Sequence, residues 1–181
     1  MTELDAKLAE IGLIPLHQNY EICDSEDLNE ISNSFNTPIP EDYAWFISKY
    51  GNSFISKDYG FRPRENNPWL SKGGLNEITC FYSGKRGGDS GVINIRKRYL
   101  DQIDSWFLPI AESPGGNQIL LSLRPEDYGS VFFWDHEGGL DNNTYLIAES
   151  FREFLLTFEE IMASIDNERP RIVKSWISDD F

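Results

Sequence analysis

The amino-acid sequence predicts an α+β fold: a single domain with a central antiparallel sheet of about five to six strands and helices packed on one face. Two observations support this prediction. Three strand-like segments, 107–111, 118–123 and 130–135, follow one another and are separated by connections rich in glycine and proline. Helical spacing of apolar residues precedes this antiparallel meander and returns directly after it.

Three helices are predicted before the meander. The first spans residues 2–11, and the second begins at Asp24 or Ser25, residue types that cap helix N-termini. The third begins at Pro40, whose missing N–H is tolerated in the first helical turn. Their apolar stripes at helical spacing are Leu4, Leu8 and Ile11; Leu28, Ile31 and Phe35; and Tyr43, Phe46, Ile47 and Tyr50.

The last helix follows the meander. Its start is predicted from a capping box, in which the side chains of Ser150 and Glu153 can each bond the other residue's backbone N–H. Its apolar stripe continues to Met162, and the connector 13–22 can include a short strand. The other predicted elements are a short strand at 59–62, a strand at 77–82, a helix at about 92–102 and a strand at 144–148.

The composition is that of a folded protein. The chain has 181 residues, of which 40% are hydrophobic and 14% aromatic, enough for a core without metal or disulfide staples. No stretch approaches the ~18 apolar residues of a membrane span, and the acidic N-terminus shows no secretory pattern. Because Cys23 and Cys80 lack the spacing of a metal or redox motif, we expect a reducing, cytoplasmic location.

Negative charge is the most pronounced compositional feature. The net charge is −14, which argues against a nucleic-acid partner because such partners require basic surface. A negative field would speed encounter with a cationic protein. The alternative is that the charge only keeps the protein soluble.

The basic residues are concentrated in one block. Residues 51–100 contain nine bases and four acids, whereas residues 101–150 contain one base and nine acids. The bases of this block either pair internally with the acidic blocks or form a second binding face. They include Arg62, Arg64, Lys85, Arg86, Arg96, Lys97 and Arg98.

Two segments invite a chemical interpretation. His136 lies between Asp135 and Glu137, which suggests a metal ligand or a general base. Consecutive residues point in different directions, however, so a polar strand end is the favoured interpretation. The glycine-rich segment 84–91 precedes a predicted helix, as phosphate-binding loops do, but its lysine follows the first glycine instead of closing the loop. A plain loop is favoured there.

Three further motifs occur in a fixed order. The first covers residues 39–52, the second covers 108–111, 116–119 and 129–137, and the third covers 150–155. Together they resemble the SUKH superfamily, in the branch related to yeast cell-wall-assembly regulators. The resemblance implies the α+β fold predicted above.

The resemblance also implies a function. It divides the chain into an N-terminal helix and connector at 1–24, a SUKH-like domain at 25–165 and a tail at 166–181. Bacterial members are mostly immunity proteins, which bind and neutralise a cognate polymorphic or contact-dependent toxin, often a nuclease, by occlusion. The alternative is a regulatory or scaffold module that binds proteins. No catalytic residue, metal or cofactor is expected, since none is established for the family.

A partner surface is expected beside the turn at residues 115–117, which the resemblance places next to the open face of the sheet. Aromatic side chains often anchor such contacts, and acidic loops would supply a negative rim for a cationic toxin. Neither a nucleic acid nor a membrane is expected as a partner. The candidate partner-binding residues are Trp69, Gly116, Asn117, Glu126, Asp127, Trp134, Asp135, His136 and Glu137.

Overall fold

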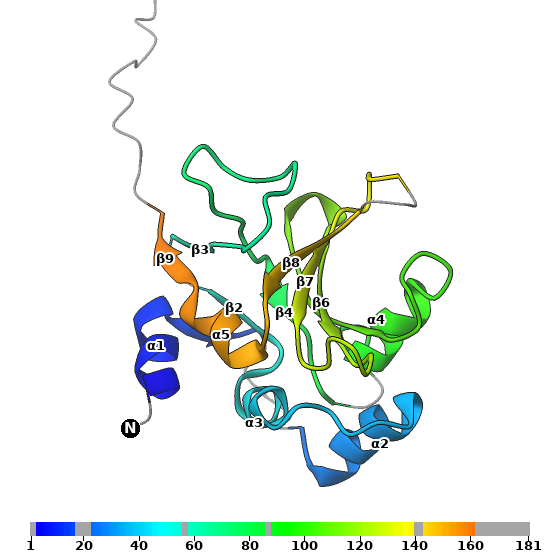
Figure 1. Cartoon of the computed structure of the whole chain (residues 1–181). Helices are drawn as coiled ribbons and strands as arrows, with labels where there is room; N and C mark the ends of the chain where they lie inside the picture. The colour runs from blue at the N-terminus through cyan, green and yellow to red at the C-terminus, as the bar shows by residue number, and fades with distance from the viewer. Residues whose placement is uncertain (1–2, 17–22, 56–57, 86–87, 140–142, 162–181) are drawn as a thin grey trace, which may run out of the picture.

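The computed structural model describes residues 3–16, 23–55, 58–85, 88–139 and 143–161 (Figure 1). Its helices are α1 (Glu3–Ile11), α2 (Ser25–Phe35), α3 (Glu41–Tyr50), α4 (Val92–Arg98) and α5 (Phe151–Leu156), with a 3₁₀ turn η1 (Pro114–Gly116). Its strands are β1 (Leu13–Pro15), β2 (Ser53–Ile55), β3 (Tyr59–Phe61), β4 (Cys80–Phe81), β5 (Phe107–Glu112), β6 (Gln118–Ser122), β7 (Val131–Trp134), β8 (Thr144–Ala148) and β9 (Phe158–Glu160).

A seven-stranded antiparallel sheet forms the centre of the domain. Its strand order is β1-β2-β4-β5-β6-β7-β8, while β3 and β9 form a separate two-stranded sheet. The predicted α+β fold is therefore confirmed, and the large sheet exceeds five to six strands because the short strands β1 and β2 extend it. Register shifts at Pro109/Ala111 and at Val131/Phe132 mark bulges, which bend and twist the strands.

The large sheet has two different faces. Ile119 of β6 and Phe133 of β7 are directly paired, are fully buried and belong to the main core. Because side chains alternate along a strand, Leu120 points the other way, into a smaller core with Phe107 and Trp134. We call the first face the covered face and the second the groove face.

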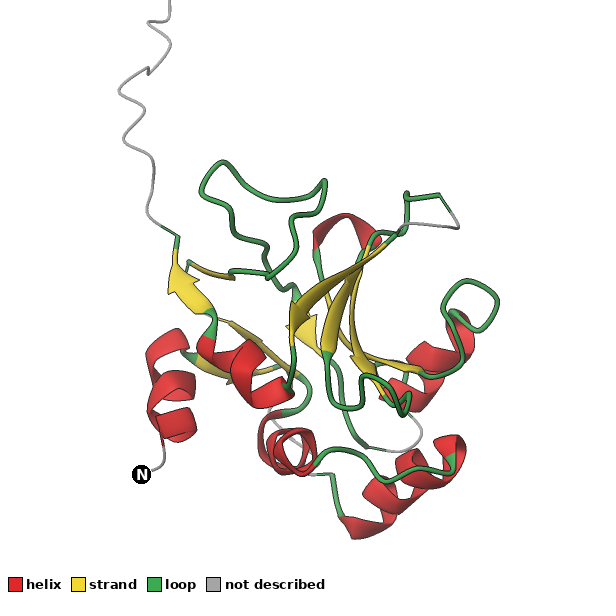
Figure 2. Cartoon of the chain, in the orientation of Figure 1, coloured by secondary structure: helices red, strands yellow, loops and turns green. Residues whose placement is uncertain are grey.

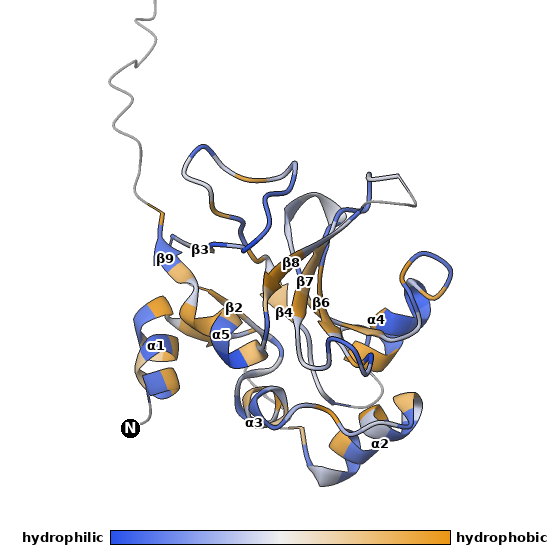
Figure 3. Cartoon of the chain, in the orientation of Figure 1, coloured by the Kyte–Doolittle hydropathy of each residue, from blue (hydrophilic) through white to orange (hydrophobic). Residues whose placement is uncertain are grey.

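Helices α1, α3 and α5 pack on the covered face. α5 contacts α1, α3 and β8, and all three helices contribute to the main core. Tyr43 of α3 meets Phe151 of α5 edge to face, with 5.0 Å between ring centroids, and such pairs add about 0.5–1.5 kcal/mol beyond their area burial. Figure 3 shows apolar residues concentrated in the central strands, against which these helices pack.

The N-terminal segment shares this core. Leu4, Leu8 and Ile11 of α1 are buried in it, and β1 pairs with β2 at the edge of the large sheet. Helix and strand are therefore part of the same packed unit as the residues that follow.

Helix α4 lies on the opposite side of β6–β8 from α5 in Figure 1. Val92 and Ile95 of α4 reach the main core, whereas Tyr99 and Ile103, just beyond the helix, pack on the groove face. The groove face is thus covered only in part. None of the helices in the described residues has both the length and the apolar character needed to cross a bilayer.

The two capped helix starts lie where the sequence predicts them. The Asp24 carboxylate accepts hydrogen bonds from the backbone N–H groups of Glu26 and Asp27, and the Asp27 side chain completes a capping box. These hydrogen bonds hold the pKa of Asp24 below its usual value. At α5, the Ser150 hydroxyl accepts from the Glu153 N–H at 3.1 Å, but the Glu153 carboxylate accepts from the Glu149 N–H at 3.0 Å and not from that of Ser150, so half of the predicted capping box forms.

Four element predictions were wrong. The strand predicted at 77–82 is limited to β4, Cys80–Phe81. The final helix ends at Leu156, and Phe158–Glu160 forms β9 against β3 instead of continuing the helix. Phe158 satisfies a helical spacing, but its ring is buried just as well beside Phe61, with 5.8 Å between ring centroids. β2 was missed within a segment interpreted as loop, and the helix predicted at about 92–102 ends at Arg98. Met162 and the predicted tail lie outside the described residues.

Candidate functional site

The η1 turn joins β5 to β6 and lies beside the end of β7. Gly115 and Gly116 have φ values of 82° and 85°, a region that favours glycine. A Cβ added to Gly115 would stand 2.5 Å from the Trp69 ring, so the turn also depends on a close approach to that side chain. Gly116 lies against the His136 ring, 3.6 Å from the position of an added Cβ.

Asp135 ties three segments together. It is 4% exposed, and its Oδ1 accepts hydrogen bonds from Trp69 Nε1 at 2.9 Å and from the Glu137 N–H at 3.1 Å. A buried carboxylate is costly unless such donors satisfy it. The Trp69 indole is therefore a structural donor as well as an aromatic surface.

Asn117 holds the backbone and the ring of His136. It is fully buried, and its Nδ2 donates to the Pro114 carbonyl at 2.9 Å. Its Oδ1 accepts from the His136 N–H at 3.1 Å and lies 3.2 Å from His136 Nδ1. Because that oxygen can only accept, the contact is a hydrogen bond when Nδ1 carries a proton, and Nε2 faces Glu137 Oε1 at 4.0 Å.

The β3–β4 connection contains Trp69 and fixes its position through hydrogen bonds within the loop. This long loop lies beside the η1 turn (Figure 2), where its Trp69 ring meets Gly115. Asn67 and Asn76 are buried and exchange two amide hydrogen bonds, at 2.8 and 3.2 Å. Asn67 Oδ1 also accepts from the Trp69 N–H at 3.0 Å. The indole is thus fixed from the loop side and from the strand side.

Six of the nine candidate partner-binding residues therefore lie together at one end of the β6–β7 hairpin. We call this group the turn cluster; its members are Trp69, Gly116, Asn117, Asp135, His136 and Glu137. His136 and Glu137 are exposed, whereas Asn117 and Asp135 are buried beneath them. The cluster presents a fixed polar surface on a rigid base.

The remaining three candidates lie elsewhere. Glu126 and Asp127 belong to the β6–β7 loop, at the opposite end of the hairpin from the turn cluster. Asp127 is paired with Arg124 and with the Ser122 hydroxyl, whereas Glu126 is exposed. Trp134 is 3% exposed and packs on the groove face, so it is a core residue of that face and not an exposed anchor.

Between these two ends the groove face contains a pocket of about 260 Å³, which we call the groove. The apolar side chains of Phe107, Leu120 and Trp134 lie at its base and are themselves buried. The residues that line it are Gln102, Ile103, Asp104, Phe107, Leu120, Arg124, Trp134, Asn143 and Thr144. Arg124 of the β6–β7 loop and Trp134, next to Asp135 in the chain, are both among them.

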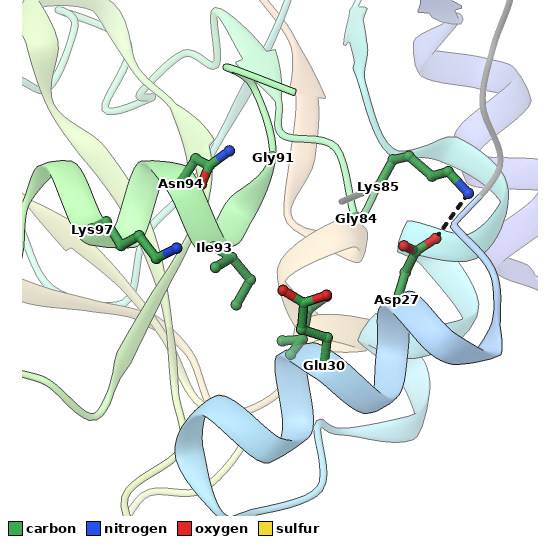
Figure 4. A pocket seen from close by; sticks show the side chains of 9 residues that line it. Asp27, Glu30, Gly84, Lys85, Gly91, Ile93, Asn94 and Lys97 are labelled. Atoms are coloured by element: carbon green, nitrogen blue, oxygen red, sulfur yellow. Dashed lines mark ion pairs between the residues drawn. The ribbon is translucent and has the colours of Figure 1, made fainter. Parts of the chain in front are cut away.

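The glycine-rich loop before α4 does not present a free lysine. Lys85 Nζ lies 3.3 Å from Oδ2 of the buried Asp27 and 3.4 Å from Asp24 Oδ2 (Figure 4). Its hydrogen bond to Asp27 raises the pKa of Lys85. The adjoining pocket, between α2 and α4, measures only about 40 Å³. These contacts join α2 to the loop and agree with the plain-loop interpretation.

Three bases of residues 51–100 are paired with acids from other parts of the chain. Lys85 is one of them. Arg62 pairs bidentately with Glu159, at 2.8 Å for both bonds, and Arg64 pairs with Glu149 and Glu153. Arg96 stacks on Phe35, 4.2 Å from its ring centroid. For these residues, internal pairing and packing account for the block better than a second binding face.

The chemistry available at the turn cluster is limited. The Asp135 oxygen bonds Trp69 and a backbone N–H, the His136 ring is held by the Asn117 amide, and the Glu137 carboxylate lies 4.0 Å from His136 Nε2. Within the described ranges, no three His, Cys, Asp or Glu side chains gather as a metal site. Burial raises the pKa of Cys23 to about 12 and of Cys80 to about 11, which disfavours the reactive thiolate.

Several functional candidates were missed from the sequence. Leu120, Arg124 and Thr144 line the groove, and Asn67 holds Trp69. Two signals could have pointed to the groove residues. Leu120 alternates with Ile119 and Leu121, so it had to face the other side of the sheet, and Arg124 is the single base among residues 101–150. Nothing in the sequence pattern pointed to Asn67.

Comparisons with known proteins agree with this architecture. The chain is 29% identical over 189 aligned positions to the SPbeta prophage-derived uncharacterized protein YokK of Bacillus subtilis (strain 168), an alignment that covers 99% of this chain and 96% of that protein. Residues 22–157 match the SMI1 / KNR4 family (SUKH-1), and this range contains the large sheet from β2 to β8. The chain therefore belongs to the SMI1 / KNR4 family (SUKH-1).

Proposed function

We propose that this protein is an immunity protein that binds a cognate, cationic protein toxin and neutralises it by occlusion in the cytoplasm of the producing cell. Family membership supports a role in immunity or regulation by protein binding. The name of its Bacillus subtilis relative gives a prophage origin, which is compatible with a toxin-linked setting. In this role the protein binds and blocks the toxin and carries out no chemical step of its own.

The observation that carries the proposal is the distribution of charge. The chain has a net charge of −14. Arg62, Arg64 and Lys85 each form an ion pair with an acidic residue of the same chain. Asp101, Asp104 and Glu126 are exposed, and none of the described lysines or arginines forms an ion pair with them. Such a surface attracts a cationic partner and repels nucleic acid.

The turn cluster supplies the second part of the proposed contact. Its exposed residues, His136 and Glu137, stand on a base fixed by Asn117, Asp135 and Trp69. A surface held in place before binding loses less conformational freedom on association. We propose that the toxin contacts this cluster and the acidic loop around Glu126 together.

Co-expression tests the function. The partner to use is the C-terminal domain of a toxin encoded beside this gene, and the readouts are survival of the host and co-purification of the two chains. Survival with a one-to-one complex is the expected result. Death of the cells despite a soluble, folded protein would contradict the proposal and favour the regulatory or scaffold alternative.

A further inference from the structure

The aromatic side chains around the groove are packed against one another in the absence of a partner. Trp134 meets Tyr99 edge to face with 5.6 Å between ring centroids, and Phe107 meets Phe132 in the same way at 5.4 Å. Leu120 between them is fully buried. Ordered aromatic packing of this kind leaves little freedom to be lost on binding.

Arg124 closes one end of the groove without adding net charge. Its guanidinium lies 4.7 Å from the Phe107 ring centroid and 5.8 Å from that of Phe132, so it stacks over both rings. It is also bonded to Asp127, with 3.1 Å between Arg124 Nε and Asp127 Oδ1. The charge of this arginine is therefore matched inside the protein.

The rim of the groove is polar and, where it is charged, negative. Gln102, Asn143 and Thr144 offer oxygen acceptors, and Asp104 lines the same wall. One Asp104 oxygen accepts the Trp106 N–H at 3.0 Å, and no described base pairs with its charge. Asp101, exposed on the same turn, adds a second negative charge nearby.

The size of the groove restricts what can occupy it. Sites for small molecules and cofactors usually measure about 300–1,000 Å³, and this groove measures about 260 Å³. One or two side chains of another protein fit this space better than a cofactor does. Arginine and lysine carry a charged head that donates to polar groups, and their slender stem needs little apolar surface, which suits a polar rim that carries Asp104.

We propose that the groove receives an arginine or lysine side chain from the protein partner. The stem enters beside the edge of Trp134, and the charged head donates to Asp104 and to the oxygens of Gln102 and Thr144. This inference rests on the proposed function for the class of partner. It goes further by assigning a specific pocket and the side chain that enters it.

Two substitutions test the pocket in the complex. Gln102→Lys places a positive charge on the rim at an exposed side chain with no hydrogen bond among the described residues, and Thr144→Arg fills the groove from β8. Each is expected to weaken the toxin complex about tenfold or more, measured as Kd by calorimetry. Ala9→Lys, on the exposed side of α1, makes the same charge change outside the groove and is expected to stay within about twofold. Equal Kd values for Gln102→Lys, Thr144→Arg and the wild type would overturn the inference.

A second measurement separates this inference from the proposed function. ¹⁵N-labelled protein is titrated with N-acetyl-arginine amide, with N-acetyl-glutamate amide as the matched control. Shifts confined to Leu120, the Trp134 indole and Thr144, seen only with the arginine probe and lost in Gln102→Lys, support the pocket even where no toxin is neutralised. Shifts spread over other surfaces, or equal shifts with the glutamate probe, would overturn it even where the protein protects cells.

Discussion

Phe132 and Phe133 are neighbours on β7 but face opposite sides of the sheet. Phe133 is completely buried in the main core, under α1, α3 and α5, whereas Phe132 is half-buried and lies beside Arg124 at the groove. The covered face thus buries its aromatic side chains under helices. The groove face is covered only by the turn that follows α4, so Phe132 stays partly exposed. This difference indicates that the covered face provides most of the stability and leaves the groove face available for contact.

The largest expected effect separates these two neighbours. Phe133→Ala removes a fully buried ring and is expected to lower the free energy of unfolding by about 3–5 kcal/mol. Phe132→Ala removes a half-buried ring and is expected to cost about 1–2 kcal/mol. Urea unfolding followed by circular dichroism measures both. Equal losses would contradict the assignment of stability to the covered face.

A smaller effect is expected from the hydrogen bond below the turn cluster. Trp69→Phe keeps a ring but leaves the buried Asp135 carboxylate without its indole donor, which is expected to cost about 1–3 kcal/mol of unfolding free energy. Trp106→Phe is the matched control because Trp106 is 40% exposed. It is expected to change the unfolding free energy by less than about 0.5 kcal/mol. Indistinguishable unfolding curves for the two variants would show that this hydrogen bond does not stabilise the site.

The reactivity of the Cys23 thiol measures how well the main core is shielded from solvent. Burial raises the pKa of Cys23 to about 12, above an unfolded value near 8.5, so the folded thiol holds its proton more tightly. This contribution to stability is complete below the unfolded pKa and is lost as pH rises toward the folded one. A thiol reagent at about pH 8 should therefore react slowly with the folded protein and rapidly in urea. Fast labelling of Cys23 in the folded state would contradict its burial.

The smallest effect is expected at an ion pair that lies on neither face of the large sheet. Arg62 and Glu159 join β3 to β9, and each side chain is 49% exposed. Water and salt screen such pairs, so Arg62→Ala is expected to change the unfolding midpoint least of all these variants, and less in high salt than in low salt. A shift as large as that of Trp69→Phe would show that the small sheet contributes more to stability than its exposure suggests.

The sequence predicted the centre of this molecule better than its margins. Alternation in β6 and β7 and the capping residues Asp24 and Ser150 are local signals, and the structure confirms them. β2 and β9 are three-residue strands whose pairing partners lie far away in sequence, so no local pattern reveals them. Phe158 fits helical spacing and strand pairing equally well, and only the position of Phe61 decides between them.

The candidate site was predicted in part for the same reason. The motif residues Asn117, Asp135 and His136 could be named from the sequence, but their hydrogen bonds to one another and to Trp69 depend on how distant loops meet. The groove combines a turn after α4 with strands β5 to β8, and no single segment carries its signature.

The association rate with the toxin domain, measured by stopped flow over a range of salt concentrations, tests the central claim most directly. An acidic surface that captures a cationic partner predicts a rate that falls steeply as salt screens the attraction. A rate that does not change with salt would contradict the claim that the net charge of −14 serves binding.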